Sequence, residues 1–296
     1  MRKIGFRSQR TIAGAAEVKG IGFLTGALVR LRFLPAPPST GIVFVRTDLR
    51  PAIHIAACAE NVTGTHRRTT LGNPPHQVGL VEHILAALAG LRIDNCFVEL
   101  DAPEPPGVDG SAQPFVDVLI DAGAKLQPCR RAIYGVDEKI VVQHKGASLA
   151  LHPHGGPELK VSYFLDYGLT SPIGRQLHTE PVTPETFLNG LADSRTFLLE
   201  SEAVEMQRQG YGSRTTTADL LVFGRRGPIN NRLRYADEPA RHKILDLIGD
   251  LSLFPHNIYG HLVAYRSGHP LNIELVRRLE HQLVLENGCP AKAVAA

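Results

Sequence analysis

The sequence has no tryptophan, two methionines and only four cysteines among its 296 residues. Cys58, Cys96, Cys129 and Cys289 lie far apart, and none of them belongs to a Cys-x-x-Cys pair. This spacing argues against a thiolate zinc knot and against a dithiol redox motif. It favours free thiols in a reducing compartment.

An excess of one charge and long apolar runs are also absent. The formal net charge is only +3, and the 13 histidines are scattered rather than clustered. A nucleic-acid-binding protein would need a concentrated basic face. Residues 1–11 become polar before an apolar signal region can form, and no run is long enough to span a bilayer. We therefore expect a soluble cytoplasmic protein with no nucleic-acid partner and no transmembrane segment.

The apolar periodicity changes twice along the chain, which indicates two cycles of strands followed by helices. The first cycle contains predicted strands at 28–34, 42–45 and 96–100 and predicted helices at 81–91 and about 112–122. A joint rich in proline and charge follows at 127–131. The second cycle contains predicted strands at 139–143, 148–152 and 160–166 and predicted helices at 184–191, 203–209, 242–251 and 272–285.

This order, with strands first and helices later in each half, predicts the α+β class. A chain of this length also has enough residues for two separate cores. We therefore predict two α+β domains, at 1–127 and 132–286, followed by a flexible tail at 287–296.

The predicted helix at 242–251 places His242, Asp246 and Asp250 four residues apart, on one stripe of the helix. Hydrolytic zinc sites commonly draw three ligands from histidine and carboxylate side chains and leave one position for water. His242 and Asp246 fit two of these ligands. Alone, such a pair is weak evidence, because most helical matches are ordinary surface or capping residues.

Glu82 and His83 are candidates for the missing parts of such a site. They lie on an otherwise apolar helix, where two adjacent ionisable residues are costly unless they are paired or bound. The alternative is that both face solvent at the start of the helix. Neighbouring helical residues point about 100° apart, so a Glu82 beside a metal-binding His83 would reach a water molecule from the side. That geometry suits a general base.

His269 follows Ser267 and Gly268, and the glycine predicts a bent loop ahead of a helix that begins near Asn272. A cationic histidine beside a metal-bound amide would stabilise the oxyanion or protonate the leaving amine. Asp250, one turn beyond Asp246, is a candidate to orient it. The alternative is an ordinary capping or loop histidine.

Several segments together resemble one family, the UDP-3-O-acyl-N-acetylglucosamine deacetylases, which catalyse the committed step of lipid A synthesis. The likeness runs in order from Gln9 to about Leu279. The segments that carry it are Val-Glu-His-Ile-Leu-Ala-Ala-Leu-Ala-Gly at 81–90, Ile-Asp-Asn at 93–95, Asp-Gly-Ser-Ala at 109–112, Ser-Arg-Thr-Phe at 194–197, Arg-His-Lys-Ile-Leu-Asp-Leu-Ile-Gly-Asp at 241–250 and Ser-Gly-His at 267–269.

The resemblance implies two similar α+β domains, with their helices packed between outer sheets and a zinc site at the domain interface. It also implies a UDP-linked, acylated amino sugar as the substrate. By position, it implies that the zinc ligands are His83, His242 and Asp246, the general base is Glu82, the cationic histidine is His269 with Asp250 as its partner, the oxyanion-holding residue is Thr196, and the substrate contacts are Lys243 and Phe197.

The chain departs from the family pattern around the substrate. Leu24 stands where a site-facing histidine is usual, Arg67 stands where an apolar residue is usual, and the segment 211–219 is replaced. Arg67 and Arg214 would be costly beside a lipid tail unless they face solvent or pair with phosphate.

These departures leave two alternatives to the lipid A deacetylase. One is a related enzyme that deacetylates another nucleotide-linked or non-acylated amino sugar, and the other is a non-catalytic zinc-binding protein. Iron is an alternative metal, because a His, His, Asp set accepts several divalent ions. We favour a monomer.

Overall fold

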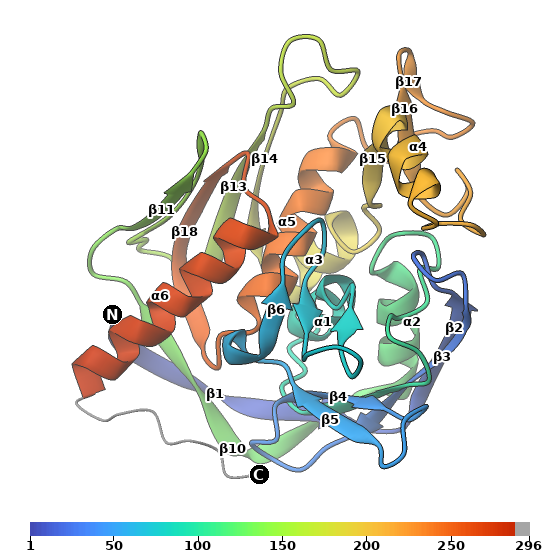
Figure 1. Ribbon diagram of the computed structural model, residues 1–296. Coiled ribbons are helices and arrows are strands. Elements are labelled where there is room, and N and C mark those ends of the chain that lie inside the picture. The colour runs from blue at the N-terminus through green and yellow to red at the C-terminus, as the bar shows by residue number, and fades with distance from the viewer. Residues whose placement is uncertain (288–296) are drawn as a thin grey trace.

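The computed structural model of the protein describes residues 1–287 and has mixed α+β architecture (Figure 1), which confirms the predicted class. From residue 288 onward, the predicted tail lies outside the described residues. No helix within 1–287 combines the length and the apolar character needed to cross a bilayer.

A five-stranded sheet is formed by residues of the first half. Its strands, in spatial order, are β2 (Ala16–Ile21), β3 (Leu28–Pro35), β9 (Cys96–Leu100), β4 (Ile42–Arg46) and β5 (Ile53–Ala56). β3 alternates as predicted: Val29, Leu31 and Phe33 are fully buried, whereas Arg30 faces solvent. This period of two gives the sheet one apolar face for the helices.

A seven-stranded sheet contains most strands of the second half and the first strand of the chain. Its members are β1 (Arg2–Ile12), β10 (Ala124–Gly135), β18 (Asn257–Tyr265), β12 (Ala147–His152), β11 (Ile140–His144), β13 (Leu159–Leu165) and β14 (Gln176–Val182). β18 is its central strand, parallel to β10 and β13 and antiparallel to β12. The chain's first strand, β1, pairs with β10, which runs through the predicted joint at 127–131. The division into two domains there stays a prediction.

Two small sheets and two short helices complete the framework around the helical layer. One sheet comprises β6 (Val62–Gly64), β7 (Thr70–Leu71) and β8 (Val78–Gly79), and the other comprises β15 (Phe197–Leu199), β16 (Leu221–Gly224) and β17 (Gly227–Pro228). The short helices are the 3-10 turn η1 (Ala59–Asn61), before β6, and α4 (Glu200–Arg208), beside β15 and β16. Figure 1 shows α4 with β16 and β17 at one end of the molecule.

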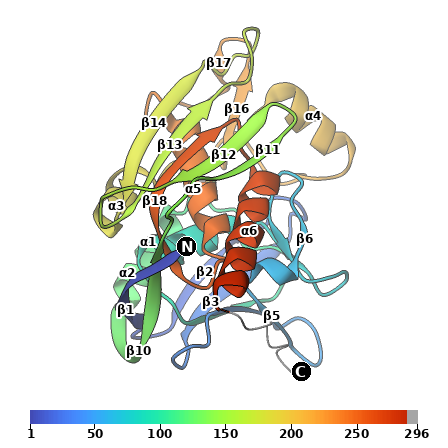
Figure 2. The ribbon, with the colours of Figure 1, turned by 90° about the vertical axis from the view of Figure 1, so that its left-hand side faces the viewer.

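The main helices are α1 (Glu82–Gly90), α2 (Gln113–Ala122), α3 (Pro184–Gly190), α5 (Glu238–Leu251) and α6 (His269–Asn287). α2 packs on β2, α5 packs on β13 and β14, and α6 packs on β11 and β12. α1 contacts α2, α3 and α5, so helices of the two halves meet in the interior. Figures 1 and 2 show α1 and α5 at the centre of the molecule, beside the strands of both large sheets.

The second-half helices α4, α5 and α6 begin three or four residues earlier than predicted. Their first turns contain polar residues and prolines, such as Glu238 and Pro239 in α5, which carry no apolar periodicity. Proline is well suited to a first helical turn because its missing N–H has no partner there.

The contact between α1 and α5 depends on Gly249. A Cβ atom placed on Gly249 would lie 2.1 Å from the backbone oxygen of Glu82. The absence of a side chain therefore lets the two backbones approach within contact distance. This approach brings the first turn of α1 alongside Asp246 and Asp250 of α5.

Gly249→Ala is expected to push α1 away from α5, because a backbone oxygen cannot move aside as the end of a flexible side chain can. Overpacking of this kind should lower the free energy of unfolding by about 3 kcal/mol. Gly155→Ala is the matched control, since its added Cβ would meet nothing within 4 Å and should change stability by less than about 0.5 kcal/mol. Denaturant unfolding of both variants checks this, and equal stabilities would contradict the proposed contact.

Candidate metal centre and active site

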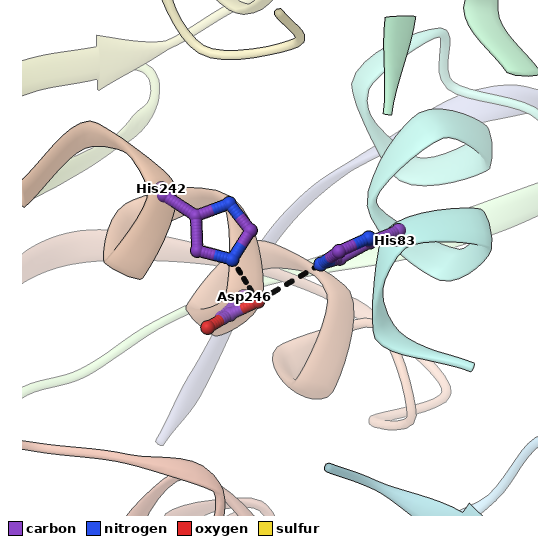
Figure 3. Close-up of side chains that lie close together, drawn as sticks. All are labelled: His83, His242 and Asp246. Carbon is purple, nitrogen blue, oxygen red and sulfur yellow. Dashed lines mark ion pairs between the residues drawn. The ribbon is translucent and has the colours of Figure 1, made fainter. Parts of the chain in front are cut away.

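His83, His242 and Asp246 converge at the junction of α1 and α5, and one ligand atom from each lies within 4.8 Å of the others. Nε2 of His83 is 3.5 Å from Oδ1 of Asp246, and Nε2 of His242 is 3.3 Å from the same oxygen. Figure 3 shows His83 reaching across from its own helix toward the pair on α5. The sequence could place His242 beside Asp246, but only the fold brings His83 to them.

The chemistry of these three residues fits a divalent cation. Nδ1 of His242 lies 2.9 Å from the backbone oxygen of Ser194 and donates its proton there, which leaves the Nε2 lone pair facing Asp246. Burial lowers the pKa of His242 to about 4, so the ring is neutral near pH 7. Two imidazole nitrogens and one carboxylate oxygen form a common donor set for zinc and similar metals.

Lys243 holds the second oxygen of Asp246. Its Nζ donates to Oδ2 of Asp246 over 2.6 Å. Burial by itself would lower the pKa of Lys243, but the charge and hydrogen bond of Asp246, together with Tyr163 and Tyr167, outweigh burial and raise that pKa above its usual range. Burial raises the pKa of Asp246 in turn, but His242 and Lys243 outweigh it and hold that pKa well below its usual range. Asp246 is therefore ionised, as a metal-binding carboxylate must be.

Glu82 is buried beside the three residues. Its Oε2 accepts a hydrogen bond from the backbone N–H of Thr69 over 3.0 Å. Burial raises the pKa of Glu82, although the neighbouring His269 and His83 oppose the shift. The alternative that Glu82 faces solvent is wrong, because only 2% of the residue is exposed. A carboxylate in such surroundings is a stronger base than one in water.

His269 and Asp250 form a buried pair next to Glu82, with Nδ1 of the histidine 2.8 Å from Oδ2 of Asp250. Burial would lower the pKa of His269, but the charge and hydrogen bond of Asp250 outweigh it and raise the pKa to about 9. His269 is therefore a cation at neutral pH. Its predicted position on a loop is wrong, since it is the first residue of α6. Pro270 follows it, at a position where a helix tolerates proline.

Two further residues of this group escaped the sequence analysis. Asp250 also accepts a hydrogen bond from Oγ1 of Thr69 over 2.5 Å and one from Nδ2 of Asn272 over 2.8 Å. Asn272 lies three residues after His269, on the same face of α6, so its spacing was a usable signal. Thr69 lies in an irregular loop, and nothing in its sequence neighbourhood distinguishes it.

The candidate metal ligands line a pocket of about 620 Å³, whose walls come from both halves of the chain. Thr196, Phe197 and Lys243 all line it, as do Glu82 and His269. The hydroxyl of Thr196 makes no hydrogen bond to any other residue within 1–287, whereas its backbone is tied to Gly110 and Leu221. Because the backbone of Thr196 is fixed and its hydroxyl has no partner within 1–287, the hydroxyl is available to donate a hydrogen bond to a ligand in the pocket.

Aromatic side chains form part of the wall beside His242. The ring of Phe197 packs edge to face against two rings. Its centroid lies 6.1 Å from the centroid of the His242 ring and 5.8 Å from that of the Tyr167 ring. Tyr163 also lines the pocket, and its hydroxyl donates to the backbone oxygen of Ser267. The pocket thus joins a charged floor to a partly apolar wall, which suits an amphiphilic ligand.

Arg67 and Arg214, the two arginines expected to be costly beside a lipid tail, both bond to other residues of the protein. Arg67 lines the pocket and its guanidinium is 3.1 Å from Oε1 of Glu202 on α4. Arg214 donates to the backbone oxygen of Gly26 over 3.1 Å. At the departure marked by Leu24, the pocket is lined by Phe23 instead, and the backbone N–H of Leu24 donates to the carboxylate of Glu104.

Comparison with known proteins gives a consistent match. A family model described as UDP-3-O-acyl N-acetylglycosamine deacetylase matches residues 9–281. A UDP-3-O-acyl-N-acetylglucosamine deacetylase of Geobacter sp. (strain M21) is 38% identical over 272 residues, which cover 92% of this chain and 88% of the relative. The enzyme of the same name from Myxococcus xanthus (strain DK1622) is 37% identical over 273 residues, covering 92% and 86%. The chain therefore belongs to the UDP-3-O-acyl-N-acetylglucosamine deacetylase family, a family of metalloenzymes.

Proposed function

We propose that this protein is a zinc-dependent amide hydrolase that removes acetate from UDP-3-O-acyl-N-acetylglucosamine, the committed step of lipid A biosynthesis. One observation carries the proposal: a single pocket contains a set of three candidate metal ligands, a buried carboxylate of raised pKa (Glu82) and a cationic histidine (His269). The names of the relatives supply the substrate. A monomeric state and a cytoplasmic location remain parts of the proposal.

His83, His242 and Asp246 would hold the metal ion, and iron is an alternative to zinc for this donor set. When bound there, a divalent cation supplies Lewis-acid chemistry, because it polarises an amide carbonyl and lowers the pKa of water. Ser194 and Lys243 support two of the ligands through the hydrogen bonds that they make to His242 and Asp246. Such outer contacts fix the orientation of ligands and raise affinity for the metal.

Glu82 takes the proton of the attacking water while the water oxygen adds to the acetamide carbon. Its raised pKa makes it a better proton acceptor, and its hydrogen bond to Thr69 fixes one carboxylate oxygen. The positive charge of His269 and the hydroxyl of Thr196 stabilise the negative charge that develops on the carbonyl oxygen. The carbon–nitrogen bond then breaks, and Glu82 or His269 returns a proton to the nitrogen. The products are acetate and a free 2-amino sugar.

Lys243 and Phe197 are proposed substrate contacts, one for a polar group and one for an apolar surface of the sugar or acyl chain. The pair of Arg67 and Glu202 supports the second candidate, an enzyme for a different or non-acylated nucleotide-linked amino sugar. Both residues of this charged pair line the pocket, where a long apolar chain would gain little by contacting them.

The two candidates are separated by offering the purified, zinc-loaded protein UDP-3-O-acyl-N-acetylglucosamine and UDP-N-acetylglucosamine and measuring the acetate released. We expect acetate from the acylated compound at a rate at least about tenfold higher. Preference for the non-acylated compound would favour the second candidate. One metal ion per chain with no acetate from either compound would refute both candidates.

Glu82→Gln keeps an oxygen that accepts the Thr69 hydrogen bond but cannot take a proton at neutral pH. We expect kcat to fall about 10²- to 10⁴-fold while metal content stays at one ion per chain. His83→Ala removes a proposed ligand, so both metal content and kcat should fall. Glu99→Gln serves as the control. Glu99 pairs with Arg32 away from the pocket, so this variant should change neither metal content nor kcat. Unchanged activity in Glu82→Gln would remove Glu82 from the mechanism.

Removal of the metal with a chelator should abolish acetate release and leave a folded protein, because the ligands are positioned by α1 and α5 rather than by the metal. Circular dichroism would report the fold, and titration with Zn²⁺ or Fe²⁺ would report which ion restores the rate. Full activity in metal-free protein would contradict the proposal.

A further inference from the structure

Thr69 is fixed to the start of α1 by its backbone. Its N–H donates to Oε2 of Glu82 over 3.0 Å, and its carbonyl oxygen accepts from the N–H of Val81 over 3.4 Å. The residue is completely buried. Both backbone contacts are local to α1, so the position of Thr69 follows that of Glu82.

The side chain of Thr69 points to the other half of the site. Oγ1 lies 2.5 Å from Oδ1 of Asp250 on α5 and 3.3 Å from Nδ1 of His269 at the start of α6. Within the described residues, Thr69 is therefore bonded both to the carboxylate Glu82 and to the pair of Asp250 and His269. Its contacts link three helices, α1, α5 and α6.

The proton positions in this group follow from what each atom can donate. The carboxylate oxygen Oδ1 of Asp250 accepts, so the single hydroxyl proton of Thr69 goes to Asp250. The Nδ1 proton of His269 goes to the other oxygen of Asp250 at 2.8 Å, and the lone pairs of Thr69 Oγ1 face the same N–H. Nδ1 of His269 thus points away from the metal-binding set, while Nε2 lies 4.0 Å from Oδ2 of Asp246.

We propose that Thr69 is a positioning residue that holds Glu82 and His269 in a fixed relation to one another. This inference rests on the proposed function, because it assigns Glu82 and His269 to successive steps on one substrate. Without the hydroxyl, the imidazole and the carboxylate of Asp250 lose a common partner. Displacements of about 1 Å in a catalytic group cost up to about 100-fold in rate.

The test compares Thr69→Val, which keeps the shape and both backbone contacts, with Thr69→Ser, which restores the hydroxyl. We expect Thr69→Val to lower kcat about 10- to 100-fold, with KM and metal content nearly unchanged, and Thr69→Ser to recover most of the rate. Thr11→Val is the matched control. It also removes a buried threonine hydroxyl, one that accepts from the N–H of Ala36, and Thr11 does not line the pocket. Its kcat should equal that of the wild type.

A second readout does not depend on turnover. In protein labelled with ¹⁵N-histidine, the ring signals of His269, assigned by their loss in His269→Asn, should move in Thr69→Val and stay in place in Thr69→Ser and Thr11→Val. Unmoved ring signals in Thr69→Val, or a wild-type kcat in that variant, would overturn the positioning role. An inactive wild-type protein would instead count against the proposed function, and the ring signals would still decide the role of Thr69.

Discussion

The close approach of α1 and α5 at Gly249 is the constraint on which the rest of the structure depends. A side chain at this position would meet the backbone of Glu82, so the absence of one sets the distance between the helices. That distance places His83 opposite Asp246 and lets Thr69 reach Asp250. Each helix is anchored by apolar neighbours: Leu85 and Leu88 of α1 and Leu245 of α5 are all buried.

Charge balance explains why this junction suits a cation. Glu82, Asp246 and Asp250 are all buried, and burial of carboxylates is costly without compensating charge. The cations beside them are Lys243, paired with Asp246, and His269, paired with Asp250. Within residues 1–287, the hydrogen-bond donor to Glu82 is a backbone N–H, that of Thr69, and the nearby cation is the more distant His269. A divalent ion near Asp246 would supply the missing positive charge and favour an ionised Glu82, as a general base requires.

The sequence predicted much of the site because helical spacing is local. Residues four apart, such as His242 and Asp246, must share a face whatever the tertiary structure. It was less informative about partners from distant segments. Thr69 contacts Asp250 across 181 positions, and its loop has no periodicity that would single it out. The sequence likewise could not predict the partner of Arg67, because its pairing with Glu202 depends on where α4 lies in space.

The fold shows the same division. The strands with alternating apolar residues were predicted within about one residue, as at β9 and β12. The central strand β18 was missed, because it lies between two helices where a simple order of strands and then helices leaves no place for it. β1 was also missed, since its many polar residues hide the pairing with β10 that begins at Arg2. Packing decides which strands far apart in sequence pair with each other, and the apolar periodicity of a strand does not predict its partner.

The central claim is that α1 and α5 together create one metal centre. Anomalous X-ray scattering, measured at the zinc edge from crystals of the protein grown with Zn²⁺, tests it most directly. The account predicts a single strong peak in contact with His83, His242 and Asp246 and adjacent to Glu82. A crystal that shows zinc elsewhere, with no peak among these three residues, would contradict it.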